Sequence, residues 1–318
     1  MIIRTVLGDI EANKLKKVSM HEHLILHMFP YLKYKNLNLD RVDAAIQELE
    51  EFKEVGGGTI VEVTPFGCGR NINMLKSISQ AAKVNIIAAT GFLGNGLGSP
   101  VLPAFPEPPQ WALKASMEDI YLVFKREIEE SAIDSSAKVG IIKVATGLNK
   151  ITKFEEKVFR AAAKTALDTG VSITTHCQMG TLALEQIKLL KDCGVPSKKI
   201  IVGHLDLNPD MKYYLEIQKT GVWLQFDRMG RDKYVPDKIR IDLISQLIKK
   251  GFTNQILLGS DMGSNAYWRS YGGSPGLRFL FGTFVKKLAG KGVSPEEITQ
   301  ITEKNPPLAL SISHQQIK

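Results

Sequence analysis

Eight short apolar runs rich in valine and isoleucine recur along this chain, and stretches with helical spacing separate them. The runs occupy residues 17–21, 59–64, 84–91, 139–146, 171–176, 199–204, 221–226 and 254–261. Apolar residues three and four positions apart mark the intervening helices, for example at 39–56, 117–132, 153–170 and 237–251. A strand and helix unit repeated in this way predicts an α/β fold, the (β/α)8 TIM barrel. We expect a single domain over residues 1–318, with a doubly wound two-domain protein as the alternative.

A stretch rich in proline and glycine, GFLGNGLGSPVLPAFPEPPQW, follows the third run at residues 91–111. Loops that follow barrel strands lie at the barrel mouth, so we interpret this stretch as a loop over the mouth and not as a domain linker. Its large apolar side chains, Phe92, Phe105 and Trp111, are expected either to cover the site or to contact a partner subunit.

The composition is that of an ordinary folded protein, with 44% hydrophobic and 23% charged residues. The net charge of +8 comes partly from lysines in segments that resemble helix ends, such as 246–251 and 286–292. We interpret this charge as solvated helix surface, which predicts no nucleic-acid partner and also suits a small anionic substrate. No apolar segment of ~18 residues and no secretory signal pattern is evident, so we expect no membrane association and a cytoplasmic location.

The chain contains three cysteines, Cys68, Cys177 and Cys193, without a CxxC spacing. An odd number without that spacing argues against a disulfide framework and against a cysteine-based zinc site. We expect reduced thiols.

Side chains that bind metals fall at the ends of the apolar runs, where a barrel carries its chemistry. His21 and His23 are two residues apart on one run, so both imidazoles point the same way and can reach one metal. The candidate metal ligands are His21, His23, Lys143, His176, His204 and Asp261. Of the six histidines only His27 and His314 lie elsewhere, and this concentration predicts a metal site instead of separate structural histidines.

Lys143 lies in the middle of VGIIKVATG, residues 139–147, a run that predicts a strand buried on both faces. A buried ammonium group is costly without a partner. Such a lysine loses its proton, pairs with a carboxylate or is chemically modified, and the run by itself leaves all three alternatives open.

Eight segments follow one another along nearly the whole chain: MHEHL, TIVEVTPFGCGRN, GIIKVATG, ITTHCQMGTLALEQ, VGHLD, FDRMG, LLGSDMG and KNPPLALSI. Together and in this order they resemble the phosphotriesterase-like branch of the amidohydrolase superfamily. The resemblance implies a hydrolase with two divalent metal ions, and zinc is the expected metal.

The resemblance also implies a role for each ligand. The more buried metal would be held by His21, His23 and Asp261. The more exposed metal would be held by His176 and His204, and Lys143 would bridge the two ions as a carbamate (N6-carboxylysine). A hydroxide shared by the metals would attack the substrate, and Asp261 would pass its proton to the leaving alkoxide. The alternative for Asp261 is a ligand without this catalytic role.

The loops after the last two runs, FDRMGRDKYVPDK and MGSNAYWRSYGGSPGLR, carry basic and phenolic side chains. Arginine gives a phosphate group paired hydrogen bonds and lysine gives it a point charge. The DKY and YWRSYGG pieces are similar to those of the branch that hydrolyses phosphorylated sugar lactones. We expect substrate-binding roles for Arg228, Lys233, Tyr234, Asn265, Tyr267, Arg269 and Tyr271, and Arg231 and Arg278 lie in the same loops. For any one of these residues the alternative is an ordinary surface position.

The expected activity is metal-dependent hydrolysis of the ester in a phosphorylated sugar 1,4-lactone. A broader lactonase or phosphotriesterase of the same family is the nearest alternative. Phe92 and Leu93 stand where acyl-homoserine lactonases usually have a tyrosine, which disfavours a quorum-signal lactonase. More distant alternatives are a metal-dependent deoxyribonuclease barrel, whose relatives commonly bridge their metals with glutamate, and a barrel that has lost its activity. The resemblance is compatible with a homodimer.

Overall fold

The eight expected strands form one parallel sheet in chain order. The structure is a computed structural model that describes residues 1–28, 36–94 and 108–312. In sheet order the strands are β3 (Lys17–Glu22), β6 (Gly57–Glu62), β7 (Asn85–Gly91), β8 (Ile141–Thr146), β9 (Ser172–Cys177), β10 (Ile200–Gly203), β11 (Trp223–Phe226) and β12 (Ile256–Leu258). Just past the last strand, the N–H of Asp261 donates to the carbonyl of His21 on the first strand at 2.9 Å. This contact brings the two ends of the sheet together, and the predicted TIM barrel is confirmed.

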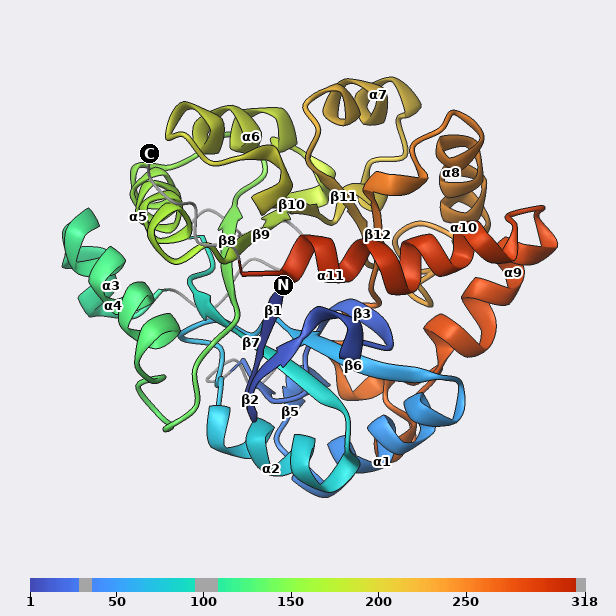
Figure 1. The fold of residues 1–318 in the computed structure, drawn as a ribbon, viewed down its shortest axis with the longest axis horizontal. Coiled ribbons are helices and arrows are strands. Elements are labelled where there is room, and N and C mark those ends of the chain that lie inside the picture. Colours follow the sequence, from blue (N-terminus) through green and yellow to red (C-terminus); the bar gives the residue numbers. More distant parts are fainter. Residues whose placement is uncertain (29–35, 95–107, 313–318) are drawn as a thin grey trace.

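Helices surround the strands in a ring (Figure 1). They are α1 (Val42–Glu54), α2 (Ile72–Ala82), α3 (Gln110–Lys114), α4 (Met117–Glu129), α5 (Lys153–Thr169), α6 (Ala183–Asp192), α7 (Met211–Lys219), α8 (Asp237–Lys249), α9 (Val285–Gly290), α10 (Pro295–Thr299) and α11 (Asn305–Leu310). Their ends follow local sequence signals. Thr152 and Glu155 form a capping box at the start of α5, and Gly170 ends that helix with a φ of 73°.

The strands are buried on both of their faces, as in other sheets covered by helices. Every residue of β8 and β9 is buried. Side chains inside the barrel, among them Val61, Ile87, Ile141 and Trp223, form one apolar cluster, and a larger cluster lies between the strands and the helices. A polar group inside this barrel therefore needs a specific partner.

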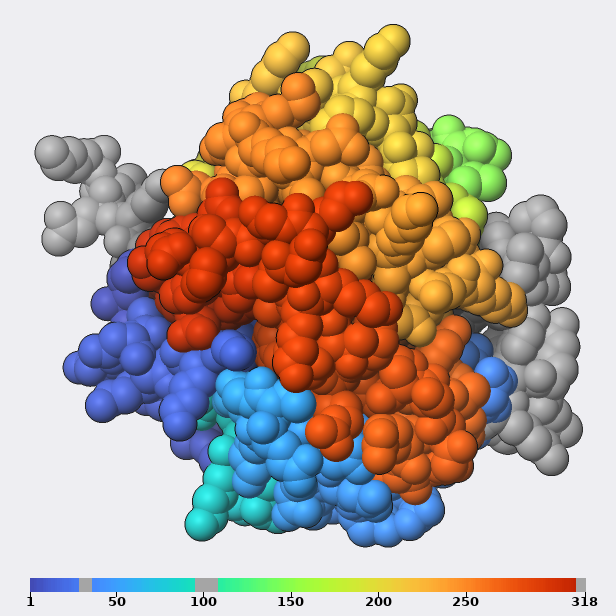
Figure 2. All heavy atoms as spheres, turned by 90° about the vertical axis from the view of Figure 1, so that its right-hand side faces the viewer, coloured from blue at the N-terminus to red at the C-terminus, as the bar shows by residue number. Residues whose placement is uncertain are grey.

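One end of the barrel is closed by the two ends of the described chain. An N-terminal hairpin, β1 (Ile2–Thr5) and β2 (Gly8–Glu11), was not expected from the sequence. The N–H of Val6 donates to the carbonyl of Ile86 near the start of β7 at 2.9 Å, and Ile2 pairs with Ile312. Figure 2 shows the blue N-terminal residues beside the red C-terminal helices. The opposite end, where the strands finish, is the end at which TIM barrels carry their active-site residues.

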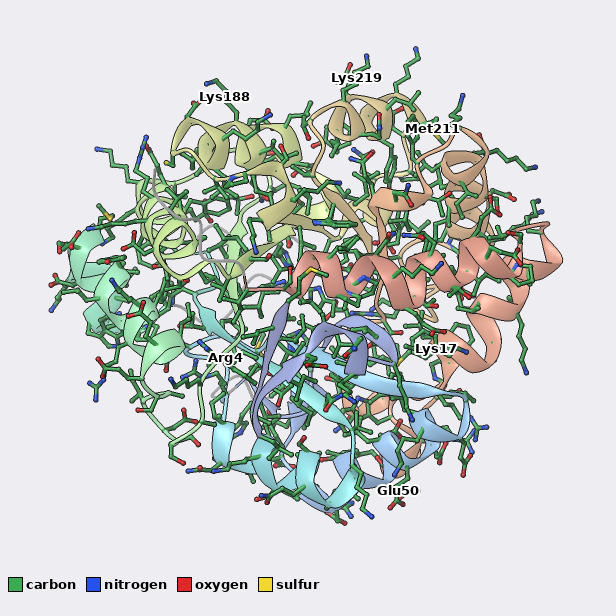
Figure 3. All side chains as sticks on the ribbon, viewed as in Figure 1. Arg4, Lys17, Glu50, Lys188, Met211 and Lys219 are labelled. Carbon is green, nitrogen blue, oxygen red and sulfur yellow. The ribbon has the colours of Figure 1, made fainter. Side chains whose placement is uncertain are left out.

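Many lysines point away from the barrel. Lys188 on α6 and Lys219 at the end of α7 extend outward at the rim in Figure 3. Lys188 pairs with Asp192 on the same exposed helix face. Among the described residues, no helix combines the length and the apolar character that crossing a membrane requires.

The stretch expected to cover the mouth is described only at its two ends. Phe92 is fully buried, with its ring 5.4 Å from that of Phe66 and 5.5 Å from that of Trp111. Trp111 itself remains 42% exposed. Phe105, like His314 at the other end of the chain, lies outside the described residues.

Candidate metal centre

Four histidines from the ends of three strands, β3, β9 and β10, meet at the carboxyl end of the barrel. The ring centroids of His21 and His204 are 4.8 Å apart, those of His176 and His204 are 4.2 Å apart, and those of His21 and His23 are 5.6 Å apart. His21, His204 and Asp261 each offer a ligand atom, and these atoms lie within 4.8 Å of one another. The cluster is therefore a candidate metal site, as the sequence predicted.

His21 and His204 share one buried carboxylate. The two oxygens of Asp227 lie 2.8 Å from Nδ1 of His21 and 2.7 Å from Nδ1 of His204. With Nδ1 of each ring facing Asp227, Nε2 is left as the metal-binding atom. Burial lowers the pKa of His21 to about 3 and that of His204 to about 4, so both rings are neutral and keep a lone pair.

The other two histidines are also held through one ring nitrogen. Nδ1 of His23 lies 2.7 Å from Oγ1 of Thr64, and Thr64 in turn donates to Glu62 at 2.5 Å. Nε2 of His176 lies 2.7 Å from the side-chain oxygen of Gln178. His23 therefore offers Nε2 to a metal, whereas His176 offers Nδ1.

Lys143 is buried inside the barrel with its amine unpaired. Its side chain is 2% exposed, and Nζ has no hydrogen-bond partner among the residues the structure describes. Burial lowers the pKa of Lys143 to about 8, which makes the neutral amine accessible near neutral pH. Of the three alternatives left open by the sequence, ordinary pairing with a carboxylate is not seen among these residues.

Asp261 is fixed by its own backbone and by the strand that carries the first two histidines. Its φ of 50° lies in the left-handed region, which is uncommon for a residue with a side chain and is often found at functional sites. Glu22 accepts hydrogen bonds from the N–H groups of Ser260 and Met262, at 3.0 and 3.1 Å. Glu22 thus binds the residues on both sides of Asp261.

Two arginines face the Asp261 carboxylate. Nε of Arg228 and a terminal nitrogen of Arg231 lie 3.0 and 2.6 Å from Oδ2. Burial alone would raise the pKa of Asp261, but the positive charges of Arg228 and Arg231 outweigh it and hold that pKa well below its usual range. Asp261 is therefore ionised and available as a ligand or a proton acceptor.

The cluster of candidate ligands opens into a cavity of about 470 Å³. His21, His23, Lys143, His176, His204 and Asp261 all line it. The same lining includes Arg228, Arg231, Lys233, Tyr234 and Tyr267. The guanidinium of Arg231 lies 5.3 Å from the ring centre of Tyr234 and 4.9 Å from that of Tyr267. The cavity is thus lined both by candidate metal ligands and by cationic and phenolic side chains.

Three residues expected to bind substrate lie elsewhere. Nε of Arg269 is 2.8 Å from Glu51 of α1, and the hydroxyl of Tyr271 accepts the N–H of Arg41 at 3.1 Å just before α1. Asn265 is not among the residues lining the cavity. The loop after β12 folds back toward α1, which places Arg269 and Tyr271 there, while Tyr267 lines the cavity.

A model of the phosphotriesterase family matches residues 1–310. The chain belongs to the phosphotriesterase family. Among its relatives, the phospho-furanose lactonases of Mycoplasmopsis synoviae and Mycoplasmopsis agalactiae are 37% and 34% identical to it. These alignments cover 97% and 96% of this chain, and 91% and 90% of the respective relatives. This family member is accordingly a hydrolase.

Solved structures agree with this assignment. An amidohydrolase from Mycoplasma synoviae superposes with a TM-score of 0.91 at 35% identity, over 99% of this chain and 93% of that one. A lactonase from Listeria monocytogenes gives a TM-score of 0.90 at 28% identity, over 98% of this chain and all (100%) of that one. The barrel of this family member therefore matches those of proteins named as hydrolases.

Three buried carboxylates that support the candidate ligands of this phosphotriesterase-family site were not predicted from the sequence. Asp227 is fully buried directly after β11, and Glu22 is buried at the end of β3, between the candidate ligands His21 and His23. Glu62 is buried at the end of β6. Their positions at the strand ends could have indicated this supporting role, because acidic residues at the ends of barrel strands are rarely buried without a partner.

Proposed function

We propose that this protein hydrolyses the ester of a phosphorylated sugar 1,4-lactone. The observation that carries the proposal is the cavity itself, whose lining holds both the candidate metal ligands and a set of cationic and phenolic side chains. A lactone with a phosphate group has two matching parts, an electrophilic carbonyl and a dianion. The cavity volume of about 470 Å³ also suits a small molecule of this size.

The residues fit a centre of two divalent ions, for which we propose zinc. His21, His23 and Asp261 would hold one ion, and His176 and His204 the other. Lys143 would join them as a carbamate, which turns an unpaired buried amine into an anionic ligand. When bound, the ions would polarise the lactone carbonyl and lower the pKa of water.

The side chains of the protein would orient the substrate and move a proton. Lys233 and Arg231, with the phenols of Tyr234 and Tyr267, would bind the phosphate group. Asp261, ionised and directed into the cavity, would accept the proton of the attacking water and deliver it to the leaving alkoxide. Water attack and this proton transfer together open the ring to the sugar-acid phosphate.

Two phospho-furanose lactonases with 37% and 34% identity support the substrate class. A broader lactonase or phosphotriesterase activity is the second candidate, favoured by the aryldialkylphosphatase of Saccharolobus solfataricus at 28% identity. The test is to assay matched sugar lactones with and without the terminal phosphate, and a paraoxon-type triester, on protein loaded with zinc. We expect kcat/KM to be highest with the phosphorylated lactone. Equal values with and without the phosphate would refute the proposal in favour of the broader activity.

A further inference from the structure

A buried glutamate on an outer helix holds the loop that brings Tyr267 to the cavity. Glu48 lies in α1 and is 1% exposed. Its Oε1 accepts the N–H of Ser270 at 2.8 Å, and its Oε2 accepts the N–H of Leu277 at 3.0 Å. One carboxylate thus binds two points of the loop after β12 that are seven residues apart in the sequence.

Backbone hydrogen bonds within the loop connect the residues that Glu48 binds to Tyr267. The N–H of Gly276, next to Leu277, donates to the carbonyl of Tyr267 at 2.7 Å. The N–H of Gly273 donates to the carbonyl of Trp268 at 2.8 Å, and the N–H of Ser274 to that of Ala266 at 3.1 Å. Residues 273–276 and 266–268 are therefore tied together, and a shift at Leu277 would move Tyr267.

Close packing leaves the carboxylate little freedom. A Cβ at Gly276 would lie 3.0 Å from Oε2 of Glu48 and 2.8 Å from Cδ of Arg269, and the φ of Gly276 is 81°. Glycine is required there because the backbone is left-handed and the glutamate approaches it closely. Figure 2 shows the light-blue region that includes α1 against the orange C-terminal segment, and the rings of Phe52 and Phe281 pack at 5.4 Å.

We infer that Glu48 is a positioning residue for substrate binding, acting through the loop of residues 264–279. Neutral or shorter side chains at position 48 would leave the N–H of Ser270, the buried N–H of Leu277 or both unpaired, so the loop would open locally. Tyr267 would then lose its place beside Arg231, whose guanidinium is 4.9 Å from the Tyr267 ring. This inference rests on the proposed function, because it assumes that Tyr267 lines the part of the cavity that binds the substrate.

The experiment compares Glu48→Ala and Glu48→Gln with Glu50→Gln. Glu50 belongs to the same helix but is exposed and extends outward at the rim in Figure 3. Hydrogen exchange is measured for peptides covering residues 264–279, together with kcat, KM and metal content. For Glu48→Ala we expect faster exchange in this loop and a roughly tenfold rise in KM for the phosphorylated lactone, equivalent to losing about 1.4 kcal/mol of binding.

Turnover at saturation and metal content should stay near the wild-type values, whereas a merely structural role would reduce the active fraction and leave KM unchanged. Glu48→Gln should fall between the wild type and Glu48→Ala, because its amide oxygen still accepts one N–H. If Glu48→Ala does not fold, the exchange and KM measurements on Glu48→Gln test the inference. Wild-type exchange in residues 264–279, or a wild-type KM, would overturn the inference. The exchange measurement needs no substrate, so it separates failure of this inference from failure of the proposed function.

Discussion

The carboxylate of Asp227 accepts a hydrogen bond from Nδ1 of His204 across 2.7 Å, and both side chains are buried. The other oxygen lies 2.8 Å from Nδ1 of His21. These histidines would belong to two different metal positions, so one carboxylate orients ligands of both. Losing Asp227 should therefore affect the two positions together.

Asp227→Asn should weaken metal binding by roughly 10- to 100-fold. The carboxylate accepts one imidazole N–H on each of its two oxygens, whereas the amide has only one oxygen that can accept. Metal affinity is measured by titration with zinc, and stoichiometry by elemental analysis. Asp192→Asn, on the exposed face of α6, is the matched control. Loss of a single metal with normal binding of the other would contradict a shared role.

Lys143→Ala should lose the metal pair and the activity together, because it removes the only amine that could supply a bridging carbamate inside the described part of the barrel. Short carboxylic acids should restore part of both, and the restored activity should not respond to bicarbonate. Metal content and turnover are measured side by side, with Lys188→Ala as the exposed control. A fully active Lys143→Ala protein would rule out the carbamate.

Asp261→Asn should lower kcat by on the order of 10²–10⁴, the usual contribution of a proton-transferring group. The amide has almost the same shape as the carboxylate but cannot accept the proton. Metal content is determined on the same sample, so that loss of a ligand is distinguished from loss of proton transfer. An Asp261→Asn enzyme with full metal content and most of its kcat would leave Asp261 as a ligand only.

Lys233→Ala should reduce kcat/KM by roughly tenfold for the phosphorylated lactone and little for the same lactone without phosphate. Lys233 lines the cavity, and the point charge it supplies would act on the phosphate alone. Lys238→Ala, an exposed lysine on α8, serves as the control. Equal losses with both lactones would remove Lys233 from the phosphate site.

A single cysteine should react with alkylating reagents in the folded protein at mildly alkaline pH. Cys193 is partly exposed, whereas burial raises the pKa of Cys68 and that of Cys177 to about 12. Their thiols therefore stay protonated, and the thiolate is the reactive form. Mass spectrometry of alkylated peptides checks this, and all three cysteines should react in urea. Rapid alkylation of Cys68 in the folded state would indicate that the cavity opens.

The strand ends were predictable because the apolar runs mark them directly. His21, His176 and His204 each lie at or just beyond the end of such a run, and each is found in the cavity. Asp227 was harder to recognise, because its role depends on histidines from two other strands that only barrel closure brings within 3 Å. Glu48 gave no signal at all, since its partners are backbone N–H groups more than 200 residues away.

By itself the sequence determined the barrel and the six candidate ligands, since hydrophobic periodicity and position at a strand end are local properties of the chain. Only the tertiary structure decided which loop side chains face the cavity. Arg269 and Tyr271 lie against α1 while Arg231 and Tyr267 line the cavity, although all four come from loops of similar composition. The direction of a loop side chain depends on distant contacts such as those of Glu48, and no local pattern encodes them.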